Sequence, residues 1–294
     1  MKLLFSVLAT LIWAASTVVN RLSVGVIDPA AISFYRWLTA LLVLSPIMLP
    51  KTWRMRQAIR PYLPKLGMLG LLGMSLYQSL AYCAAHTVSA TSMGLILATM
   101  PLLTVLVAFP LLNTRPTLPL LAGAAVSFAG LAWLLAAGDL PPLWQQGVGL
   151  GEWLMLLATL SYALYCVLVK RWQIPLPTWK SLYVQILCGT LLLVPPFLLT
   201  SSMALSAQSL PLVLFAGLFA SALAPGLWIQ SLQCLGPEKT AVLMNLVPLF
   251  TAALAIGLLG ETLHLYHAVG GGLILLGIIL AQWPPARVTA STRP

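Results

Sequence analysis

Long apolar blocks, separated by short polar or proline-rich stretches, run through the whole chain. Each block approaches the roughly 20 residues that a helix needs to cross a bilayer, and none alternates with the two-residue period of a barrel strand. Only helices and closed barrels satisfy every backbone polar group in lipid. The pattern therefore predicts ten transmembrane helices, at residues 3–20, 29–50, 64–84, 88–112, 117–137, 149–171, 178–200, 210–234, 238–259 and 265–283.

The composition indicates that lipid is the solvent for most side chains. Of the 294 residues, 60% are hydrophobic and only 7% are charged, whereas a soluble domain carries about 25% charged residues. The loops between the blocks are short, which leaves no room for a soluble catalytic domain. We therefore expect an all-α integral membrane protein.

The net charge of +10 is distributed unevenly between the loops. With ten crossings, most basic residues fall on one side, and the opposite side holds only Arg21 together with four acids, Asp28, Asp139, Glu152 and Glu261. The positive-inside rule then predicts a multi-pass protein of the cell inner (cytoplasmic) membrane with both termini in the cytoplasm. This distribution favours contact with membrane lipid headgroups over binding of phosphate or nucleic acid. The basic residues of that side are Lys2, Lys51, Arg54, Arg56, Arg60, Lys65, Arg115, Lys170, Arg171, Lys180, Lys239, Arg287 and Arg293.

The first block resembles a secretory signal peptide, because one lysine precedes an apolar core and small residues follow it. However, the tetrapeptide "LATL" at 8–11 returns at 157–160. A segment that opens one half of a duplicated protein is kept as a span, so we predict that this block is a transmembrane helix.

The duplication extends over most of the chain. Aligning the prolines at 101 and 248 also aligns the threonines at 104 and 251 and two pairs of glycines, Gly123 with Gly270 and Gly130 with Gly277. Residues 1–137 and 149–283 are thus predicted to be two copies of a five-helix unit, followed by a cytoplasmic tail at 284–294. Because five is odd, the second copy enters the membrane from the opposite side. Inverted repeats of this kind place a substrate site near the midplane, between the halves.

Several segments resemble the drug/metabolite transporter (DMT) superfamily, and within it the ten-helix EamA-type exporters. They are "FYRWLTALL" at 34–42, "NLVPLFTAALAIGLLGETL" at 245–263 and "HAVGGGLILLGIIL" at 267–280. The resemblance implies a secondary transporter that works by alternating access, with proton coupling as an expectation from the family. The chain departs from the family at "LLNTRPT", where Asn113, Thr114 and Arg115 replace the Gly-Glu pair expected after the fourth span.

Pro101 and Pro248 occupy equivalent places in the two halves. Inside a helix, a proline removes one donor and displaces the carbonyl four residues back, which predicts unpaired carbonyls at Leu97 and Met244. Two interpretations follow. The prolines either act as paired hinges beside a central cavity or are packing kinks, which are common in membrane helices.

Two charged residues are candidates for a role in transport. Arg36 lies well inside the second span, where a charge costs about 2.5–3.5 kcal/mol on insertion scales. It either anchors an anionic group such as a substrate carboxylate, or it snorkels to the interface or pairs with a carbonyl or an acid. Glu261, which matches the family's glutamate, either carries a coupling proton or fixes the turn between spans nine and ten.

Aromatic and amide side chains in spans one, three, six, eight and nine are predicted to line the cavity, where apolar walls with a few hydrogen-bonding points suit a small amphiphilic ligand. Plain packing is the alternative for the same residues. The candidates are Trp13, Tyr77, Gln78, Tyr82, Tyr162, Tyr165, Trp228, Gln230 and Asn245.

These features predict an exporter of small amphiphilic metabolites, namely amino acids or their derivatives, that acts as a monomer or weak homodimer without a cofactor. An exporter of drugs or nucleosides and a non-transporting receptor or assembly subunit are the alternatives. A membrane enzyme is disfavoured because the few acids and histidines lie mostly at span edges. No metal site or disulfide is expected, because His264 and His267 lack further ligands and the four cysteines form no C-x-x-C pair.

Overall fold

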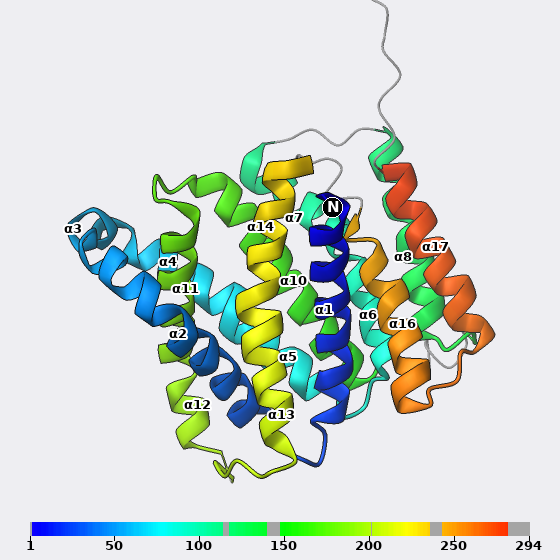
Figure 1. Ribbon diagram of the computed structural model, residues 1–294. Helices are drawn as coiled ribbons and strands as arrows, with labels where there is room; N and C mark the ends of the chain where they lie inside the picture. Colours follow the sequence, from blue (N-terminus) through cyan, green and yellow to red (C-terminus); the bar gives the residue numbers. More distant parts are fainter. Residues whose placement is uncertain (1, 114–117, 140–147, 201, 236–242, 282–294) are drawn as a thin grey trace, which may run out of the picture.

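The computed structural model describes residues 2–113, 118–139, 148–200, 202–235 and 243–281, and every regular element in these ranges is a helix. The two halves of the chain form one bundle (Figure 1). The prediction of an all-α membrane protein is confirmed.

The first half contains spans one to five. Its elements are α1 (Lys2–Leu22), α2 (Pro29–Trp53), α3 (Arg56–Ile59), the 3₁₀ turn η1 (Arg60–Tyr62), α4 (Leu63–Gly70), the π-helical η2 (Leu71–Leu76), α5 (Tyr77–Ala84), α6 (Ala90–Ala98), α7 (Met100–Leu112) and α8 (Leu118–Leu135). Span three is therefore built from α4, η2 and α5, and span four from α6 and α7.

The second half repeats this organisation. Its elements are α10 (Leu150–Trp172), α11 (Thr178–Leu192), α12 (Val194–Leu198), α13 (Ser209–Leu214), the π-helical η3 (Phe215–Leu223), α14 (Ala224–Leu235), α16 (Leu246–Leu259) and α17 (Leu265–Ala281). In the described part of the chain, eight helical stretches are long and apolar enough to cross a membrane, and α16 and α17 are shorter apolar helices. A π-helical segment thus occurs in span three and again in its counterpart, span eight.

The two halves are interleaved, because helices of each half pack against helices of the other. Helix α1 packs against α14 and α16 of the second half, and α10 packs against α5 and α7 of the first half. Since α10 is the counterpart of α1, these two sets of contacts are related by the duplication. Helices α2 and α11 pack against each other, as do α8 and α17. The surface where the halves meet, called the seam below, therefore involves all ten spans.

The glycines of α8 and α17 show that the repeat is inverted. The sequence aligns Gly123 with Gly270 and Gly130 with Gly277, but in the structure Gly123 lies against Gly277 and Gly130 lies against Gly270. Crossed pairing of this kind arises when two equivalent helices run antiparallel about a twofold axis, because each residue then meets the counterpart of the other. The prediction of inverted five-helix repeats is confirmed.

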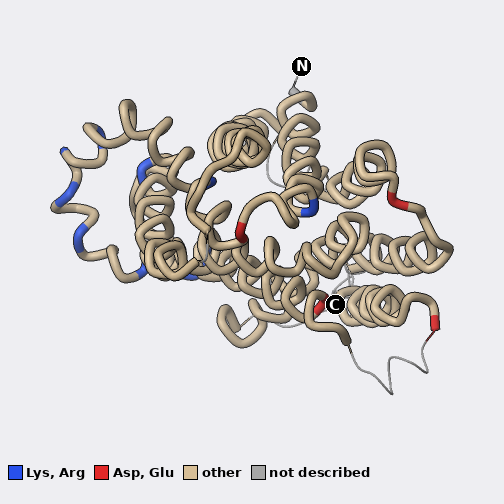
Figure 2. The backbone as a smooth tube through the Cα atoms, turned by 90° about the horizontal axis from the view of Figure 1, so that it is seen from below, with Lys and Arg blue, Asp and Glu red and all other residues tan. Residues whose placement is uncertain are grey.

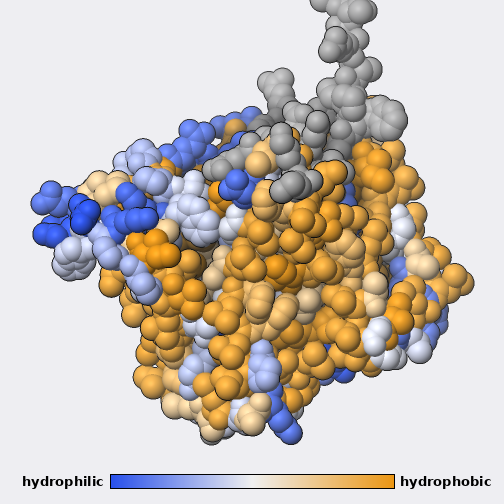
Figure 3. All heavy atoms as spheres, viewed as in Figure 1, coloured by the Kyte–Doolittle hydropathy of each residue, from blue (hydrophilic) through white to orange (hydrophobic). Residues whose placement is uncertain are grey.

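Charged residues mark two ends of the bundle. Spans two and three join through the basic segment 51–65, and the last turn of α10 carries Lys170 and Arg171; we call this end of the bundle the basic face. Asp28 lies between spans one and two, and Glu261 lies between spans nine and ten. Both are at the opposite end of the bundle, which we call the acidic face. Figure 2 shows how Lys and Arg gather around α2 to α4, and hydrophobic side chains dominate the surface seen in Figure 3.

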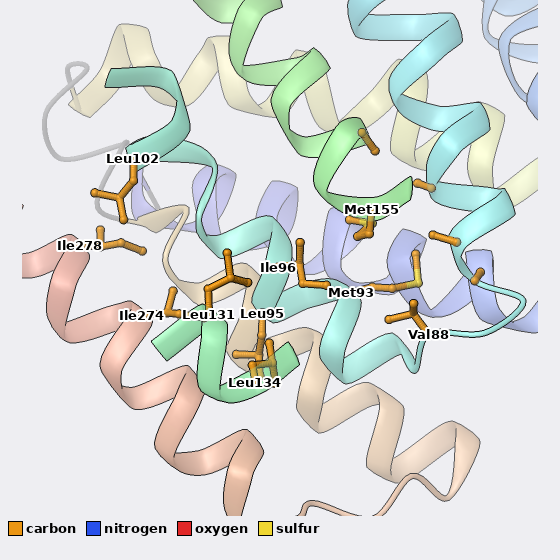
Figure 4. Packing of buried hydrophobic residues seen from close by; sticks show 14 residues of the cluster. Val88, Met93, Leu95, Ile96, Leu102, Leu131, Leu134, Met155, Ile274 and Ile278 are labelled. Carbon is orange, nitrogen blue, oxygen red and sulfur yellow. The ribbon is translucent and has the colours of Figure 1, made fainter. Parts of the chain in front are cut away.

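The largest buried apolar cluster joins both halves close to span four. Met93 and Ile96 of α6 pack with Leu131 of α8, Met155 of α10 and Ile274 of α17. Figure 4 shows these side chains forming one cluster between α6, α8, α10 and α17. This cluster holds α6 between elements of the second half, so that any movement of span four involves both halves.

The structure corrects the expectation of unpaired carbonyls at the two prolines. Pro101 stands in the first turn of α7 and Pro248 in the first turn of α16, where backbone N–H groups have no intrahelical partner and a missing one costs nothing. The helices are interrupted just before each proline. The Leu97 carbonyl accepts the N–H of Thr99, and the Met244 carbonyl accepts the N–H of Val247 at 3.0 Å.

Candidate functional site

Arg36 is buried at the seam, where α2 meets three other spans. Its Nε donates to the hydroxyl of Ser221 in η3 at 2.7 Å, and its Nη1 donates to Ser16 of α1 at 2.9 Å and to the Tyr82 hydroxyl of α5 at 3.4 Å. Only 5% of the Arg36 surface is exposed. The guanidinium therefore lies inside the bundle and does not snorkel to the interface.

The three acceptors that the described residues provide to Arg36 are neutral hydroxyls. A guanidinium carries five N–H donors and stays charged in proteins, and the three hydroxyls occupy donors on Nε and Nη1 only. A buried charge is costly unless it is paired. Two of the chain's acids have other partners, because Asp28 accepts the N–H of Ala30 at the start of α2 and Glu261 binds α6. The hydroxyl cage thus holds the guanidinium without neutralising it.

A second polar contact lies one helical turn along α1 and α5 from the first. Asn20 follows Ser16 by four residues, Gln78 precedes Tyr82 by four, and residues at this spacing lie on one face of a helix. Gln78 Nε2 donates to Asn20 Oδ1 at 3.1 Å, and both side chains are buried. The face of α1 toward span three is therefore polar over at least two turns.

Aromatic side chains from both halves meet on either side of these polar contacts. The rings of Trp13 and Trp228 have centroids 5.4 Å apart. Tyr77 lies 5.0 Å from Tyr162, and Tyr162 lies 5.2 Å from Tyr165. We call these last three residues the tyrosine row; each of them is partly exposed.

The carbonyls of the two π-helical segments accept hydrogen bonds from neighbouring spans. Ser161 of α10 donates to the Leu72 carbonyl of η2 at 2.9 Å, and Trp13 of α1 donates through Nε1 to the Ala220 carbonyl of η3 at 3.2 Å. Both donors come from the opposite half of the molecule. π-Helical turns are frequent at functional sites, and here they direct backbone carbonyls into the seam.

Two predicted lining residues lie apart from this set. Gln230 is exposed on α14, away from its sequence counterpart Gln78, which is buried. Asn245 immediately precedes α16 and is half-buried, and its side chain does not cap that helix. The structure therefore brings together Trp13, Arg36, Tyr77, Gln78, Tyr82, Tyr162, Tyr165 and Trp228 along the seam.

The prolines are followed by the same local hydrogen bond in both halves. Thr104 donates to the carbonyl of Met100, and Thr251 donates to the carbonyl of Val247, each at 2.8 Å. Each threonine thus bonds the residue that directly precedes the proline. A cavity of about 60 Å³ lies beside Pro101 and is lined by apolar side chains of α7, α8 and α17, so it offers no polar side chain to a substrate.

Glu261 binds the N-terminus of α6 in the other half of the chain. Its Oε1 accepts the N–H of Ala90 at 2.8 Å, and its Oε2 accepts the N–H of Thr91 at 3.0 Å and the Thr91 hydroxyl at 2.7 Å. A carboxylate is favoured at this end of a helix by the free N–H groups and the helix dipole. The residue therefore joins span four to the turn between spans nine and ten.

His267 makes a second link to the same helix. Its Nδ1 accepts the backbone N–H of His264 at 3.2 Å, which places the proton of the neutral ring on Nε2, and Nε2 lies 3.2 Å from the Ser92 hydroxyl. No group of three or more His, Cys, Asp or Glu side chains that would suit a metal occurs among the described residues. The two histidines thus serve hydrogen bonding at the acidic face.

Three residues of the site were missed by sequence reasoning. Ser16 and Ser221 accept hydrogen bonds from Arg36, and Asn20 accepts one from Gln78. For Ser16 and Asn20 a signal existed, because two polar residues four apart in a mostly apolar span lie on one helix face. Ser221 carries no such signal, since only the fold brings it next to Arg36.

Inverted five-helix repeats that pack into each other, with polar groups between them, are the architecture of a membrane transporter. The model of the EamA-like transporter family matches residues 1–136 and 149–283. The chain therefore belongs to the EamA-like transporter family of the DMT superfamily, and its function is transport rather than enzymatic catalysis.

Relatives of known sequence extend over nearly the same length. An uncharacterized transporter of Archaeoglobus fulgidus is 26% identical over 280 residues, which cover 93% of this chain and 94% of that protein. A probable terminal-alkyne amino-acid exporter of Streptantibioticus cattleyicolor is 25% identical over 276 residues, covering 93% and 91%. A solved crystal structure with 20% identity superposes with a TM-score of 0.67 over 99% of this chain and 98% of its own, which shows a shared fold.

Proposed function

We propose that the protein exports small amphiphilic metabolites, namely amino acids or their derivatives, from the cytoplasm by alternating access. The observation that carries the proposal is the buried guanidinium of Arg36, held by three neutral hydroxyls between the halves. The hydroxyls leave the donors of Nη2, which can bind a carboxylate oxygen through charge-assisted hydrogen bonds. The amino-acid exporter among the relatives is consistent with such a substrate.

The aromatic side chains complete the proposed site. The Trp13–Trp228 pair and the tyrosine row come from both halves and flank the polar contacts of α1 and α5. An apolar wall with a few fixed polar groups matches a ligand that has one charged end and one apolar end. A substrate held between the halves is released to one side or the other when the halves move, which is the essence of alternating access.

The proposed orientation places the basic face in the cytoplasm and the acidic face outside. Lys51, Arg54, Arg56 and Arg60 lie on the basic face, and the start of α1 and the end of α17 lie at the same end of the bundle (Figure 1). The excess of Lys and Arg in loops on one side is what sets the orientation of membrane proteins. Export then begins with binding from the basic face and ends with release at the acidic face.

Transport of paired compounds by reconstituted protein tests the role of Arg36. Proteoliposomes are loaded with an amino acid, its carboxamide or its decarboxylated amine, and efflux is compared between the native protein and Arg36→Gln. We expect the native protein to prefer the carboxylate and Arg36→Gln to lose about tenfold or more of that preference, since a hydrogen bond to a charged group contributes roughly 1.5–3 kcal/mol.

Arg21 provides the matched control. Its guanidinium donates to the backbone carbonyls of Ala85 and His86 at the acidic face, and it lies outside the proposed site. Arg21→Gln should therefore keep the preference for the carboxylate. Equal preference in the native protein and Arg36→Gln would contradict the proposal and favour a neutral substrate, such as a nucleoside or a lipophilic drug.

A further inference from the structure

At the acidic end of the seam, span four contacts the second half. The carboxylate of Glu261 accepts three hydrogen bonds from Ala90 and Thr91 in the first turn of α6, at 2.7 to 3.0 Å. Ala90 also belongs to a small buried cluster, in which it packs with Val18 of α1 and Ala255 of α16. Spans one, four and nine therefore meet beneath the carboxylate.

The position of Glu261 in the chain makes this contact one between the halves. The residue follows Gly260, which has a left-handed backbone conformation (φ +66°) and ends α16. That turn directs the chain from span nine toward the start of span four. Opening of the acidic face requires α6 and α16 to separate, and the three hydrogen bonds must then break.

The first half lacks an equivalent group. Asn113 has the same left-handed conformation (φ +52°) at the end of α7 that Gly260 has at the end of α16. The next residue is Thr114, which carries no carboxylate. A charged acceptor at this position of the repeat is therefore present for the acidic face and missing for its symmetry counterpart at the basic face.

We infer that Glu261 is the gating residue of this transporter, and that its carboxylate latches the acidic end of the seam shut by binding the N-terminus of α6. The latch favours the state in which the acidic face is closed, and its release accompanies opening toward that face. The inference rests on the transport function but on neither the substrate nor the role of Arg36.

A reporter cysteine beneath the latch measures opening directly. Ala255 is fully buried and packs in one cluster with Ala90, whose N–H binds Glu261. We therefore expect Ala255→Cys, in a chain whose four native cysteines are replaced by serine or alanine, to react with a membrane-impermeant thiol reagent only when α6 and α16 separate. We expect Glu261→Gln to raise the labelling rate about tenfold or more, because it removes a charge from three hydrogen bonds. Thr91→Val removes one of the three and should give a smaller increase.

Two controls separate gating from a general loss of stability. Glu152→Gln alters another acid of the same face, in the first turn of α10, and should leave the labelling rate unchanged. Ala40→Cys places the reporter at a fully buried position of α2 in a different cluster. An unchanged rate at Ala255→Cys on removal of the Glu261 charge overturns the inference, and so does an equal increase at both reporters. Neither result bears on substrate preference, which the Arg36 variants test separately.

Discussion

Gly130 of α8 and Gly270 of α17 meet backbone to backbone: a Cβ atom on Gly130 would stand 2.7 Å from the carbonyl oxygen of Gly270. The reverse also holds, since a Cβ atom on Gly270 would stand 2.9 Å from the Gly130 carbonyl. Small residues allow this close approach of membrane helices, which associate through van der Waals packing rather than the hydrophobic effect. The contact fixes spans five and ten to each other across the repeat.

We predict that Gly130→Ala lowers the stability of the protein by about 1–3 kcal/mol, the usual cost of overpacking a close contact. The obstructing atoms belong to the backbone and to the Leu273 Cβ, so no side-chain rotation relieves the clash. Thermal unfolding in detergent measures the change.

Gly272→Ala is the control for this prediction. Gly272 lies on the same helix α17, and nothing stands within 4 Å of its ideal Cβ position. Because alanine favours a helix over glycine by up to about 1 kcal/mol, this variant should be as stable as the native protein or more so. Equal loss of stability in both variants would show that the backbone contact is unimportant.

The prolines lead to a second prediction, that Pro101→Ala and Pro248→Ala slow turnover more than they weaken substrate binding. Alanine restores an N–H at each position, which the carbonyl of Leu97 or Met244 accepts if the helix continues through the interruption. The two spans then lose their flexible points. Transport kinetics in proteoliposomes give turnover and KM separately.

Pro110 serves as the comparison for these variants, because it lies inside α7 beyond the interruption and is exposed. Pro110→Ala should leave turnover close to that of the native protein. If Pro101→Ala and Pro248→Ala also turn over normally, the two prolines are features of packing and not of movement.

The ten spans and their inverted duplication are predictable from sequence because both depend on properties that are local and periodic. An apolar block of the right length forms a transmembrane helix in lipid. Pro101 and Pro248 can be aligned from the sequence alone, without knowledge of any contact. The same alignment does not tell whether a proline kinks a helix or begins one. That outcome depends on which N–H groups donate to the carbonyls four residues before each proline. Here the Leu97 carbonyl accepts the N–H of Thr99, and the Met244 carbonyl accepts the N–H of Val247.

The direction of the site residues is less predictable, as Gln78 and Gln230 show. The repeat aligns "YQSL" with "IQSL", yet Gln78 is buried and Gln230 is exposed. The π-helical segment ends at Leu76 in span three but at Leu223 in span eight, much further from the aligned glutamine. π-Helical turns change the helical phase of the residues that follow, so that identical residues at aligned positions of the two halves do not face the same way.

Gly73 is predicted to position the tyrosine row. It lies in η2 against the ring of Tyr165, and a Cβ atom at Gly73 would stand 2.8 Å from Cδ2 of that ring. Gly73→Ala should displace the ring, break the hydrogen bond of 3.1 Å from the Tyr165 hydroxyl to Gln185 and raise the KM for transport several-fold.

A double-mutant cycle shows whether Gly73 acts through the ring. In the background of Tyr165→Leu, adding Gly73→Ala should have little further effect, because interacting residues give non-additive changes. Gly67→Ala, in α4 with nothing within 4 Å of the added atom, should leave transport unchanged. Additive effects of Gly73→Ala and Tyr165→Leu would assign the two residues independent roles.

The proposed orientation predicts which loops an impermeant thiol reagent reaches in intact cells. Gln57 of α3 is exposed on the basic face, and Gln208 is exposed immediately before α13, at the acidic face. In a cysteine-free background we expect Gln208→Cys to be labelled in intact cells and Gln57→Cys to be labelled only after permeabilisation. The physical reason is the excess of Lys and Arg around Gln57, since positively charged loops remain in the cytoplasm. Labelling of Gln57→Cys in intact cells would place the basic face outside, and the direction of export proposed above would be wrong.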